Sequence, residues 1–237
     1  MKNTGKKHSF FLNHFTKGEL ILWFGSVSLI LLSFIIFDRE GYVTLFSSLL
    51  AVTSLVYVAK GDPIGQILLV FFIIFYAIVS LSYRYYGEVI TYVCMSFPMS
   101  VLSLVSWFKN TCKGNKRQVK IGQVGKKELS LLLILAIAVS VLFYFILGAL
   151  DTKNLLVSTF SVTTSFSAAY LTYRRSPLYA LAYAANDVVL IVLWALATVD
   201  NIKYLSMVIC FIAFLANDLY GFFNWKRMEK NQAKKSI

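Results

Sequence analysis

Two Ala-Asn-Asp triplets in the last third of the chain place an amide beside a carboxylate inside strongly apolar sequence. They occur in "ANDVVLIVLW" (185–194) and "ANDLYGFFNW" (216–225). A carboxylate at the centre of a membrane helix costs about 3 kcal/mol on insertion scales, and such residues usually face the bundle interior or a water-filled path. Nine of the eleven acidic residues lie at or beyond the ends of apolar runs, so Asp187 and Asp218 are the candidates for holding a polar ligand.

The neighbours of these triplets at helical spacing add aromatic and amide groups. Tyr183 lies three residues before Asn186, and Trp194 lies seven residues after Asp187, so each pair shares one helix face. Acids and amides with aromatic rings suit a planar polar ligand, which stacks on a ring and hydrogen-bonds through ring substituents or sugar hydroxyls. The further candidates for the same substrate-binding site are Asn217, Asp218, Tyr220, Asn224, Gln66 and Trp107.

Each triplet also has a structural interpretation. Asn and Asp side chains hydrogen-bond between membrane helices, with a contribution of about 0.6–2 kcal/mol each. For Asn186 and Asp187 we favour ligand binding, because an acid at mid-membrane depth is costly. Asn217 and Asp218 lie nearer the end of their apolar run, and both interpretations stay open there. Trp225 directly precedes Lys226 and Arg227, which favours an aromatic anchor at the membrane interface.

The composition indicates an integral membrane protein that positions these residues on helices. The chain has 237 residues, of which 58% are hydrophobic and 14% charged, and its mean hydropathy is +0.70. A helix needs about 20 apolar residues to cross roughly 30 Å of hydrocarbon. The sequence predicts an all-α fold of eight transmembrane helices, near 20–37, 42–59, 63–82, 87–108, 128–150, 153–172, 177–198 and 201–224.

The basic residues are divided unequally between alternate loops. Nineteen of the 23 Lys and Arg residues fall on one side and four on the other. Since Lys and Arg gather in cytoplasmic loops, both termini are predicted in the cytoplasm. The cytoplasmic segments are then a tail at 1–19, a loop at 109–127 and a tail at 225–237. The net charge of +12 thus reflects topology and does not favour nucleic acid as a partner.

The basic loop at 109–127 divides the apolar runs four and four, which indicates an internal repeat. A shift of 114 residues superimposes Pro177 on Pro63 and Arg174 on Lys60. Helices an even number apart point the same way, so the repeats are parallel, as in SWEET-type carriers. We therefore predict a SWEET-like 3+1+3 core: an extra N-terminal helix (20–37), a three-helix repeat (42–108), a linker helix (128–150) and a second three-helix repeat (153–224).

Pro98 lies inside the fourth apolar run, where a proline removes one backbone hydrogen bond and kinks the helix. In a carrier such a kink serves as a hinge, although a static bend is the equal alternative.

Several kinds of chemistry have no residues to support them. Both histidines lie in the N-terminal segment, the three cysteines are scattered, and no His-Glu-x-x-His, Gly-x-Ser-x-Gly or phosphate-binding glycine loop occurs. We therefore expect neither an enzyme, nor a metal site, nor a cofactor.

Three stretches resemble the PnuC family of bacterial vitamin transporters: "YAANDVVLIVLWAL" (183–196), "FLANDLYGFFNWKRM" (214–228) and "YGEVITYVCMSFPMSVLSLVSWFKN" (86–110). The resemblance implies a SWEET-like fold in the bacterial cytoplasmic (cell inner) membrane. It also implies import of nicotinamide riboside by facilitated diffusion and alternating access, with a cytoplasmic kinase that traps the substrate for pyridine nucleotide biosynthesis. The implied partners are a small vitamin or nucleoside, membrane lipid and that kinase, and a homo-oligomer is compatible with the sequence.

One position departs from the family pattern. Nicotinamide riboside transporters carry Trp-x-x-x-Asn on the helix that matches 177–198, and here Ala182 stands at the Trp position while Asn186 is present. Tyr183 or Trp194 would then supply the stacking surface. Thiamine, riboflavin and deoxynucleosides remain alternative substrates, and a positively charged ring would explain aspartates without a cation. A non-transporting membrane sensor and a proton-coupled carrier are the alternatives outside this scheme.

Overall fold

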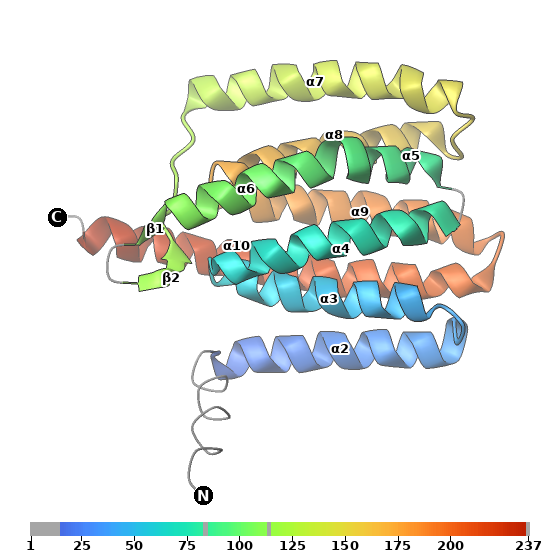
Figure 1. Ribbon diagram of the computed structural model, residues 1–237, viewed down its shortest axis with the longest axis horizontal. Helices are drawn as coiled ribbons and strands as arrows, with labels where there is room; N and C mark the ends of the chain where they lie inside the picture. Colours follow the sequence, from blue (N-terminus) through green and yellow to red (C-terminus); the bar gives the residue numbers. More distant parts are fainter. Residues whose placement is uncertain (1–14, 83–84, 113–114, 236–237) are drawn as a thin grey trace, which may run out of the picture.

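The computed structural model describes residues 15–82, 85–112 and 115–235 (Figure 1). Eight helices of this described part are long and apolar enough to cross a membrane, as expected. They are α2 (Lys17–Phe37), α3 (Tyr42–Ala59), α4 (Pro63–Ser82), a composite span formed by α5 (Tyr86–Ile90), η1 (Thr91–Ser96) and α6 (Phe97–Lys109), then α7 (Lys126–Ala149), α8 (Leu155–Tyr173), α9 (Leu178–Thr198) and α10 (Leu205–Lys235). A short 3-10 turn, η2 (Ile202–Tyr204), precedes α10.

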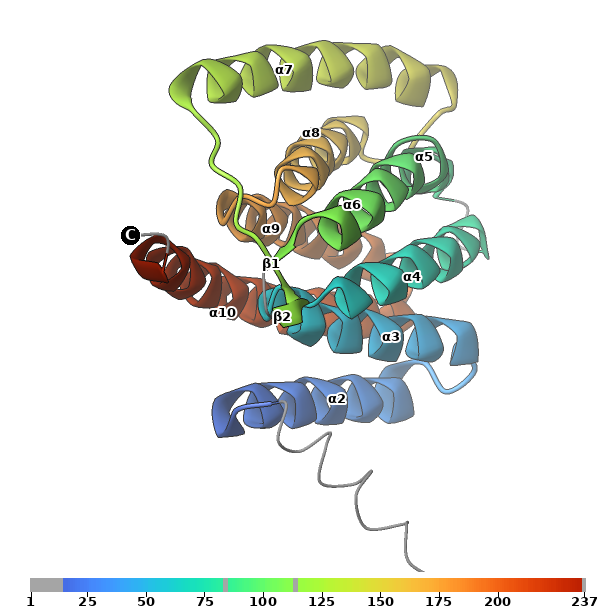
Figure 2. The same cartoon turned by 60° about the vertical axis from the view of Figure 1, so that its left-hand side comes forward.

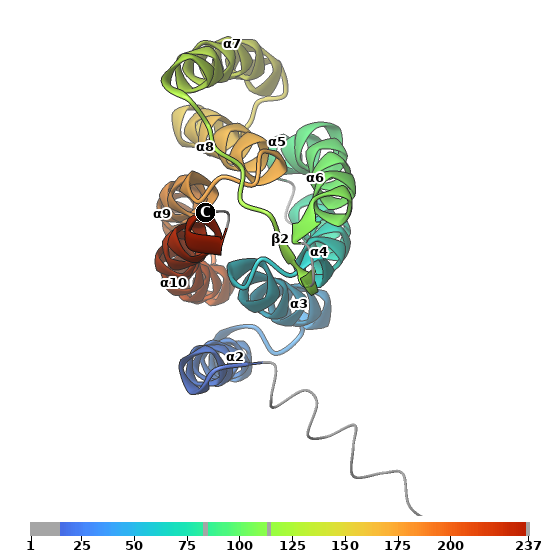
Figure 3. The same cartoon turned by 90° about the vertical axis from the view of Figure 1, so that its left-hand side faces the viewer.

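The helices form two facing columns. Viewed end-on, α8, α9 and α10 stack on one side and α6, α4 and α3 on the other (Figure 3). The columns contact each other where α3 meets α10 and where α6 meets α8. α7 packs on α8 at one edge, and α2 packs on α3 and α10 at the opposite edge (Figure 2). Each column consists of three successive spans, and the division of the chain into a 3+1+3 core with two parallel repeats stays a prediction.

Local sequence determines where α2 and α4 begin. α2 starts with a capping box, in which Thr16 and Glu19 each accept a backbone N–H from the other. α4 starts at Pro63, a residue that suits the first position of a helix because it has no N–H to leave unpaired. Before it, Gly61 adopts a left-handed φ of 68° and Asp62 accepts the N–H of Ile64 at 3.0 Å.

The fourth span is not a single kinked helix. Residues 91–96 form a π-helix, η1, and Pro98 is the second residue of the α-helix that follows. In the first turn of a helix a proline is tolerated, so the irregularity lies in η1, before the proline. π-helical turns occur frequently at functional sites. The role of Pro98 as a hinge stays a prediction.

The C-terminal helix is longer than the sequence predicts. α10 continues to Lys235 and includes most of the expected tail at 225–237. Its last turns pack on a small hairpin, β1 (Thr111–Cys112) and β2 (Asn115–Val119), within the basic loop. Gln232 accepts the N–H of Ile121 at 2.9 Å and donates to the carbonyl of Val119 at 3.0 Å. These tertiary contacts support helical structure beyond the apolar run.

The interpretation of Trp225 as an interfacial anchor is wrong. Its side chain is fully buried (0% exposed) and its indole N–H donates to the Val58 carbonyl at 2.8 Å. Because α10 extends past this residue and α3 covers it, the adjacent basic residues do not place it at a surface.

A glycine at the α3–α4 crossing provides a test of this packing. A Cβ at Gly65 would lie 2.6 Å from the Val58 backbone nitrogen and 3.0 Å from the Ser54 carbonyl oxygen. We expect Gly65→Ala to destabilise the protein by about 1–3 kcal/mol, or roughly 2–10 °C in Tm, measured by thermal unfolding in detergent. Gly25→Ala in α2 is the control, since a Cβ there meets nothing within 4 Å. Equal Tm values for the two variants would contradict the close crossing.

Candidate functional site

A small cavity lies between the two columns, at the level of the first Ala-Asn-Asp triplet. Its volume is about 50 Å³, and its walls come from α3, α4, η1, α8, α9 and α10. A water molecule needs at least about 10–15 Å³ of such space, whereas sites for small organic ligands are typically 300–1,000 Å³. The cavity is therefore too small for such a ligand in this conformation, and its walls must move to admit one.

The two triplets converge in this cavity. Asp187 on α9 and Asp218 on α10 both line it. Each is only 4% exposed, and Asp187 Oδ2 has no hydrogen-bond partner. The sequence places Asp218 nearer the membrane surface than Asp187, but antiparallel packing of α9 on α10 brings the two carboxyl groups together. No Lys or Arg is among the described residues that line the cavity.

The hydroxyl-rich face of α8 holds the amide next to this pair. Thr164 and Ser165 both donate to Asn186 Oδ1, at 2.8 and 3.0 Å. Two donors on one oxygen fix the orientation of the amide, which itself lines the cavity. The hydroxyl-rich helix α8 therefore positions a candidate ligand-binding group.

Gln66 on α4 provides a polar group from the opposite column. Its side chain is fully buried (0% exposed), lines the cavity and has no hydrogen-bond partner on either Nε2 or Oε1. A buried amide without partners costs about 1–3 kcal/mol. Together with Asp187 Oδ2, it gives the cavity unpaired donors and acceptors on both columns, as a site for a polar ligand requires.

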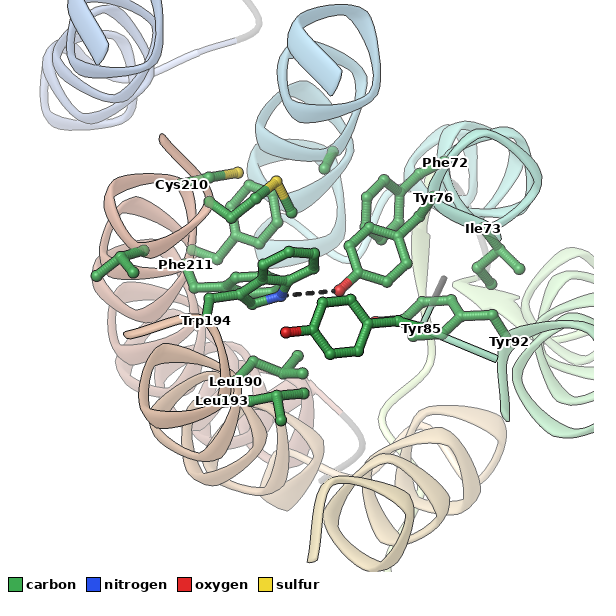
Figure 4. Close-up of a cluster of buried hydrophobic side chains, with 14 of the residues drawn as sticks. Phe72, Ile73, Tyr76, Tyr85, Tyr92, Leu190, Leu193, Trp194, Cys210 and Phe211 are labelled. Atoms are coloured by element: carbon green, nitrogen blue, oxygen red, sulfur yellow. Dashed lines mark hydrogen bonds between the residues drawn. The ribbon is translucent and has the colours of Figure 1, made fainter. Parts of the chain in front are cut away.

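An aromatic cluster lies beyond the cavity, on the side away from the termini, and Figure 4 shows its side chains. This Trp194 cluster consists of Trp194, Tyr76, Tyr85 and Tyr92, contributed by both columns and all at most 7% exposed. The Trp194 indole N–H donates to Tyr76 Oη at 3.2 Å, and the Tyr76 and Tyr92 rings lie 4.4 Å apart. Burial raises the pKa of Tyr85 to about 12, so its phenol stays neutral.

A second aromatic cluster lies beside the cavity, on the side near the termini. This Trp107 cluster consists of Trp107, Trp225 and Tyr179, with Trp225 centred 5.3 Å from Trp107 and 4.8 Å from Tyr179. The Trp107 indole N–H donates to the Thr172 carbonyl at 2.9 Å. Tyr92 of the first cluster and Tyr179 of the second both line the cavity, so the cavity lies between the two clusters.

The structure separates the sequence-predicted residues into three groups. The cavity contains Gln66, Tyr183, Asn186, Asp187 and Asp218. The aromatic clusters contain Trp194 and Trp107.

The third group faces neighbouring helices. Asn217 donates to Ser26 of α2 at 2.9 Å, Tyr220 donates to Glu19 of α2 at 3.1 Å, and Asn224 donates to a carbonyl of α3 at 2.8 Å.

Other residues of the site are absent from the sequence-based candidates. The cavity walls also include Phe72, Tyr92, Tyr179, Phe211 and Phe214. On α4, a stripe with helical spacing from Gln66 through Leu69 and Phe72 or Ile73 to Tyr76 could have indicated part of this set. In η1 and α10, aromatic residues occur on several sides of the helix, so the sequence does not distinguish those that line the cavity from the others.

Glu88 is a buried acid that lies outside the cavity. Glu88 in α5 is 2% exposed and accepts a hydrogen bond from Ser161 of α8 at 3.3 Å. It begins an apolar run, so the sequence indicates a surface position, but α8 covers it.

Comparisons with known proteins agree with this architecture. Residues 41–227 match the model of a family described as nicotinamide mononucleotide transporter. The chain is 23% identical over 233 residues to the nicotinamide riboside transporter PnuC of Neisseria mucosa, an alignment that covers 93% of this chain and 84% of the relative. It also shares its fold with a crystal structure of the vitamin B3 transporter PnuC, with a TM-score of 0.81 and 19% identity over 92% of this chain and 94% of the other. These relatives are transporters and not enzymes, and the chain belongs to the PnuC family of membrane transporters.

Proposed function

We propose that this protein imports nicotinamide riboside across the bacterial cytoplasmic membrane by facilitated diffusion. The observation that carries the proposal is the cavity between the columns, where unpaired groups of Gln66 and Asp187 face a small space whose other walls are mainly apolar. Amides and carboxyl groups suit the ribose hydroxyls and carboxamide of such a ligand, and the aromatic walls suit its ring. The names of the relatives support this substrate, and thiamine, riboflavin and deoxynucleosides are the alternatives.

The two aromatic clusters support alternating access to the cavity. In this proposal each cluster is a gate: the Trp194 cluster opens while the Trp107 cluster stays closed, and then the reverse. The loop that contains the hairpin reinforces the gate at the Trp107 cluster. The Val119 N–H donates to the carbonyl of Gly61, between α3 and α4, at 2.8 Å, and the Gly122 N–H donates to the carbonyl of Arg175, between α8 and α9, at 2.9 Å. Opening this end requires these bonds to break.

The acid pair also supports metabolic trapping. With both termini in the cytoplasm, as the distribution of Lys and Arg favours, the Trp107 cluster is the inner gate. A cytoplasmic kinase would convert the imported nucleoside into a phosphate monoester. The negative charge of that product is repelled by Asp187 and Asp218, so it would not return through the cavity. Uptake then needs neither ATP nor a coupled ion.

The direct test is uptake of radiolabelled nicotinamide riboside into liposomes that contain the purified protein. We expect saturable uptake that equilibrates without ATP and without an ion gradient, and competition by unlabelled substrate. Thiamine, riboflavin and deoxynucleosides serve as competitors that rank the alternatives. Uptake of none of these compounds would contradict a carrier function, and uptake that requires a pH gradient would contradict facilitated diffusion.

Two adjacent residues of α10 allow a matched test of the site. Asp218 lines the cavity, whereas Asn217 faces α2. We expect Asp218→Ala to weaken nicotinamide riboside binding about 10–100-fold, because a hydrogen bond to a charged group contributes ~1.5–3 kcal/mol. Asn217→Ala should lower Tm and leave the Kd within about twofold. Calorimetry and thermal unfolding in detergent measure both, and equal losses of affinity would contradict the assignment of the cavity.

The Trp194 cluster can be tested as a gate through Cys210, which is buried (2% exposed) beside it (Figure 4). In a background without Cys94 and Cys112, Tyr76→Phe removes the acceptor for the Trp194 indole. We expect faster labelling of Cys210 by a membrane-impermeant thiol reagent from the side of this cluster. Adding Trp194→Phe should change the rate little further, since the hydrogen bond is already lost. Unchanged labelling would contradict gating at this cluster.

A further inference from the structure

Another pocket lies at the end of the bundle where α2 begins and the hairpin packs on α10 (Figure 1). Its volume is about 450 Å³, within the range of about 300–1,000 Å³ that is usual for small-molecule sites. Its walls come from α2, the turn between α3 and α4, β2 and α10. It shares no lining residue with the central cavity, so it is a separate site.

Positive charge predominates among the residues that line this basic pocket. Its cations are Lys60, Arg117 and Arg227, and Glu19 is the one acid among the described residues that line it. Glu19 is buried (2% exposed) and accepts from Lys60 Nζ at 2.9 Å, so its charge is compensated within the pocket wall. Three cations against one acid favour an anionic ligand.

The two guanidinium groups are the accessible charges of the basic pocket. Arg117 and Arg227 are both exposed. The acid nearest to Arg227 in the sequence, Glu229, pairs with Lys226 at 3.0 Å. A guanidinium donates two parallel hydrogen bonds to a phosphate, and a phosphate monoester presents three acceptor oxygens and about two negative charges at pH 7. A phosphate group therefore matches cations that come from several sides.

Amide side chains surround these cations. The basic pocket is also lined by Asn115 and Gln118 of β2 and by Asn224 and Asn231 of α10. Amides suit the hydroxyl groups that accompany a phosphate, either in a nucleotide or in the headgroup of an anionic lipid. Basic pockets between membrane helices bind such headgroups, and free nucleotides carry the same phosphate chemistry.

The basic pocket spans the elements that must separate when the gate at the Trp107 cluster opens. Each of its three cations belongs to a different element: the α3–α4 turn, the hairpin or α10. In the closed arrangement the Val119 N–H donates to the Gly61 carbonyl at 2.8 Å, and Gln118 Nε2 donates to Met228 Sδ at 2.9 Å. A phosphate that bridges the three elements would strengthen these contacts.

We propose that the basic pocket binds a phosphate group, and that the bound phosphate holds the gate at the Trp107 cluster closed. The ligand is a small phosphate ester or the headgroup of an anionic lipid. The effect on the gate rests on the proposed function, whereas binding of the phosphate does not. Since a ligand shifts an equilibrium toward the state that it binds better, occupancy of the basic pocket lowers the rate of transport.

Binding is tested by calorimetry with adenosine monophosphate and the full chain in an uncharged detergent. We expect saturable binding that weakens as KCl is added, because exposed charges are screened. Arg117→Ala and Arg227→Ala should each weaken binding about tenfold or more. Adenosine, which lacks the phosphate, should not displace the nucleotide.

Lys230→Ala is the matched control, since it removes an exposed cation one turn further along α10 and outside the basic pocket. It should leave the Kd within about twofold, because a surface charge outside the site contributes little. Equal losses of affinity in Lys230→Ala and Arg227→Ala would overturn a defined site.

A lipid experiment distinguishes the two sources of the phosphate. Delipidated protein receives anionic phosphatidylglycerol or zwitterionic phosphatidylcholine, and Tm reports binding. Stabilisation by phosphatidylglycerol alone, lost in Arg117→Ala and Arg227→Ala and without binding of the nucleotide, identifies a lipid headgroup as the ligand. Binding of neither phosphatidylglycerol nor the nucleotide, in protein that unfolds cooperatively on heating, would overturn the inference.

Uptake of nicotinamide riboside into liposomes tests the effect on the gate. Adenosine monophosphate on both sides of the membrane, at ten times its Kd, should slow uptake about tenfold, because only the unoccupied fraction opens. Arg227→Ala should lose most of this inhibition and Lys230→Ala should retain it. Binding of the nucleotide with undiminished uptake would overturn the effect on the gate.

Two outcomes separate this inference from the proposed function. Uptake of nicotinamide riboside by protein that binds neither the nucleotide nor phosphatidylglycerol would overturn the inference alone. Binding of either phosphate compound, in protein that takes up none of the candidate substrates, would support the site and contradict the proposed function.

Discussion

Hydrocarbon cannot hydrogen-bond, so every polar group that a helix carries into the membrane must find its partner within the protein or remain unpaired at a cost. Much of the bundle follows from this constraint. The hydroxyls of α8 donate to Asn186, Asn217 joins α10 to α2, and the indole of Trp225 donates to α3. Each of these polar groups holds one helix of the bundle against another.

The same constraint gives meaning to the few groups that lack partners. Gln66 and Asp187 Oδ2 are unpaired beside the cavity that lies between the two aromatic clusters. A packed core would have replaced them with apolar side chains, as it does for Leu190 and Leu193 one or two turns away. Unpaired polar groups thus lie at the centre, and dense aromatic packing lies at both ends. In the proposed transport cycle, such a site fills with water or ligand when it opens and excludes water when it closes.

Sequence reasoning recovers the helices because apolar length is a strong signal. The bounds of α3 and α4 agree with the expected runs, and Asp187 is identified because an acid in such a run is rare. The presence of Asp187 and Asp218 at one cavity depends on the packing of α9 on α10, which no local sequence pattern reports. Likewise, Trp225 and the last turns of α10 are governed by contacts with α3 and the hairpin, residues more than a hundred positions away. The burial of Glu88 depends on α8 in the same way.

Asn217 and Asp218 are neighbours on one helix but serve different surroundings, one bonded to α2 and the other facing the cavity. Successive side chains on an α-helix point about 100° apart. The directions of Asn217 and Asp218 are therefore fixed relative to each other as long as α10 stays helical. Any rotation of α10 that carries Asp218 out of the cavity must also pull Asn217 away from Ser26. The edge helix α2, which lies before the region that matches the family, therefore restrains the rotation of α10 and with it the position of Asp218.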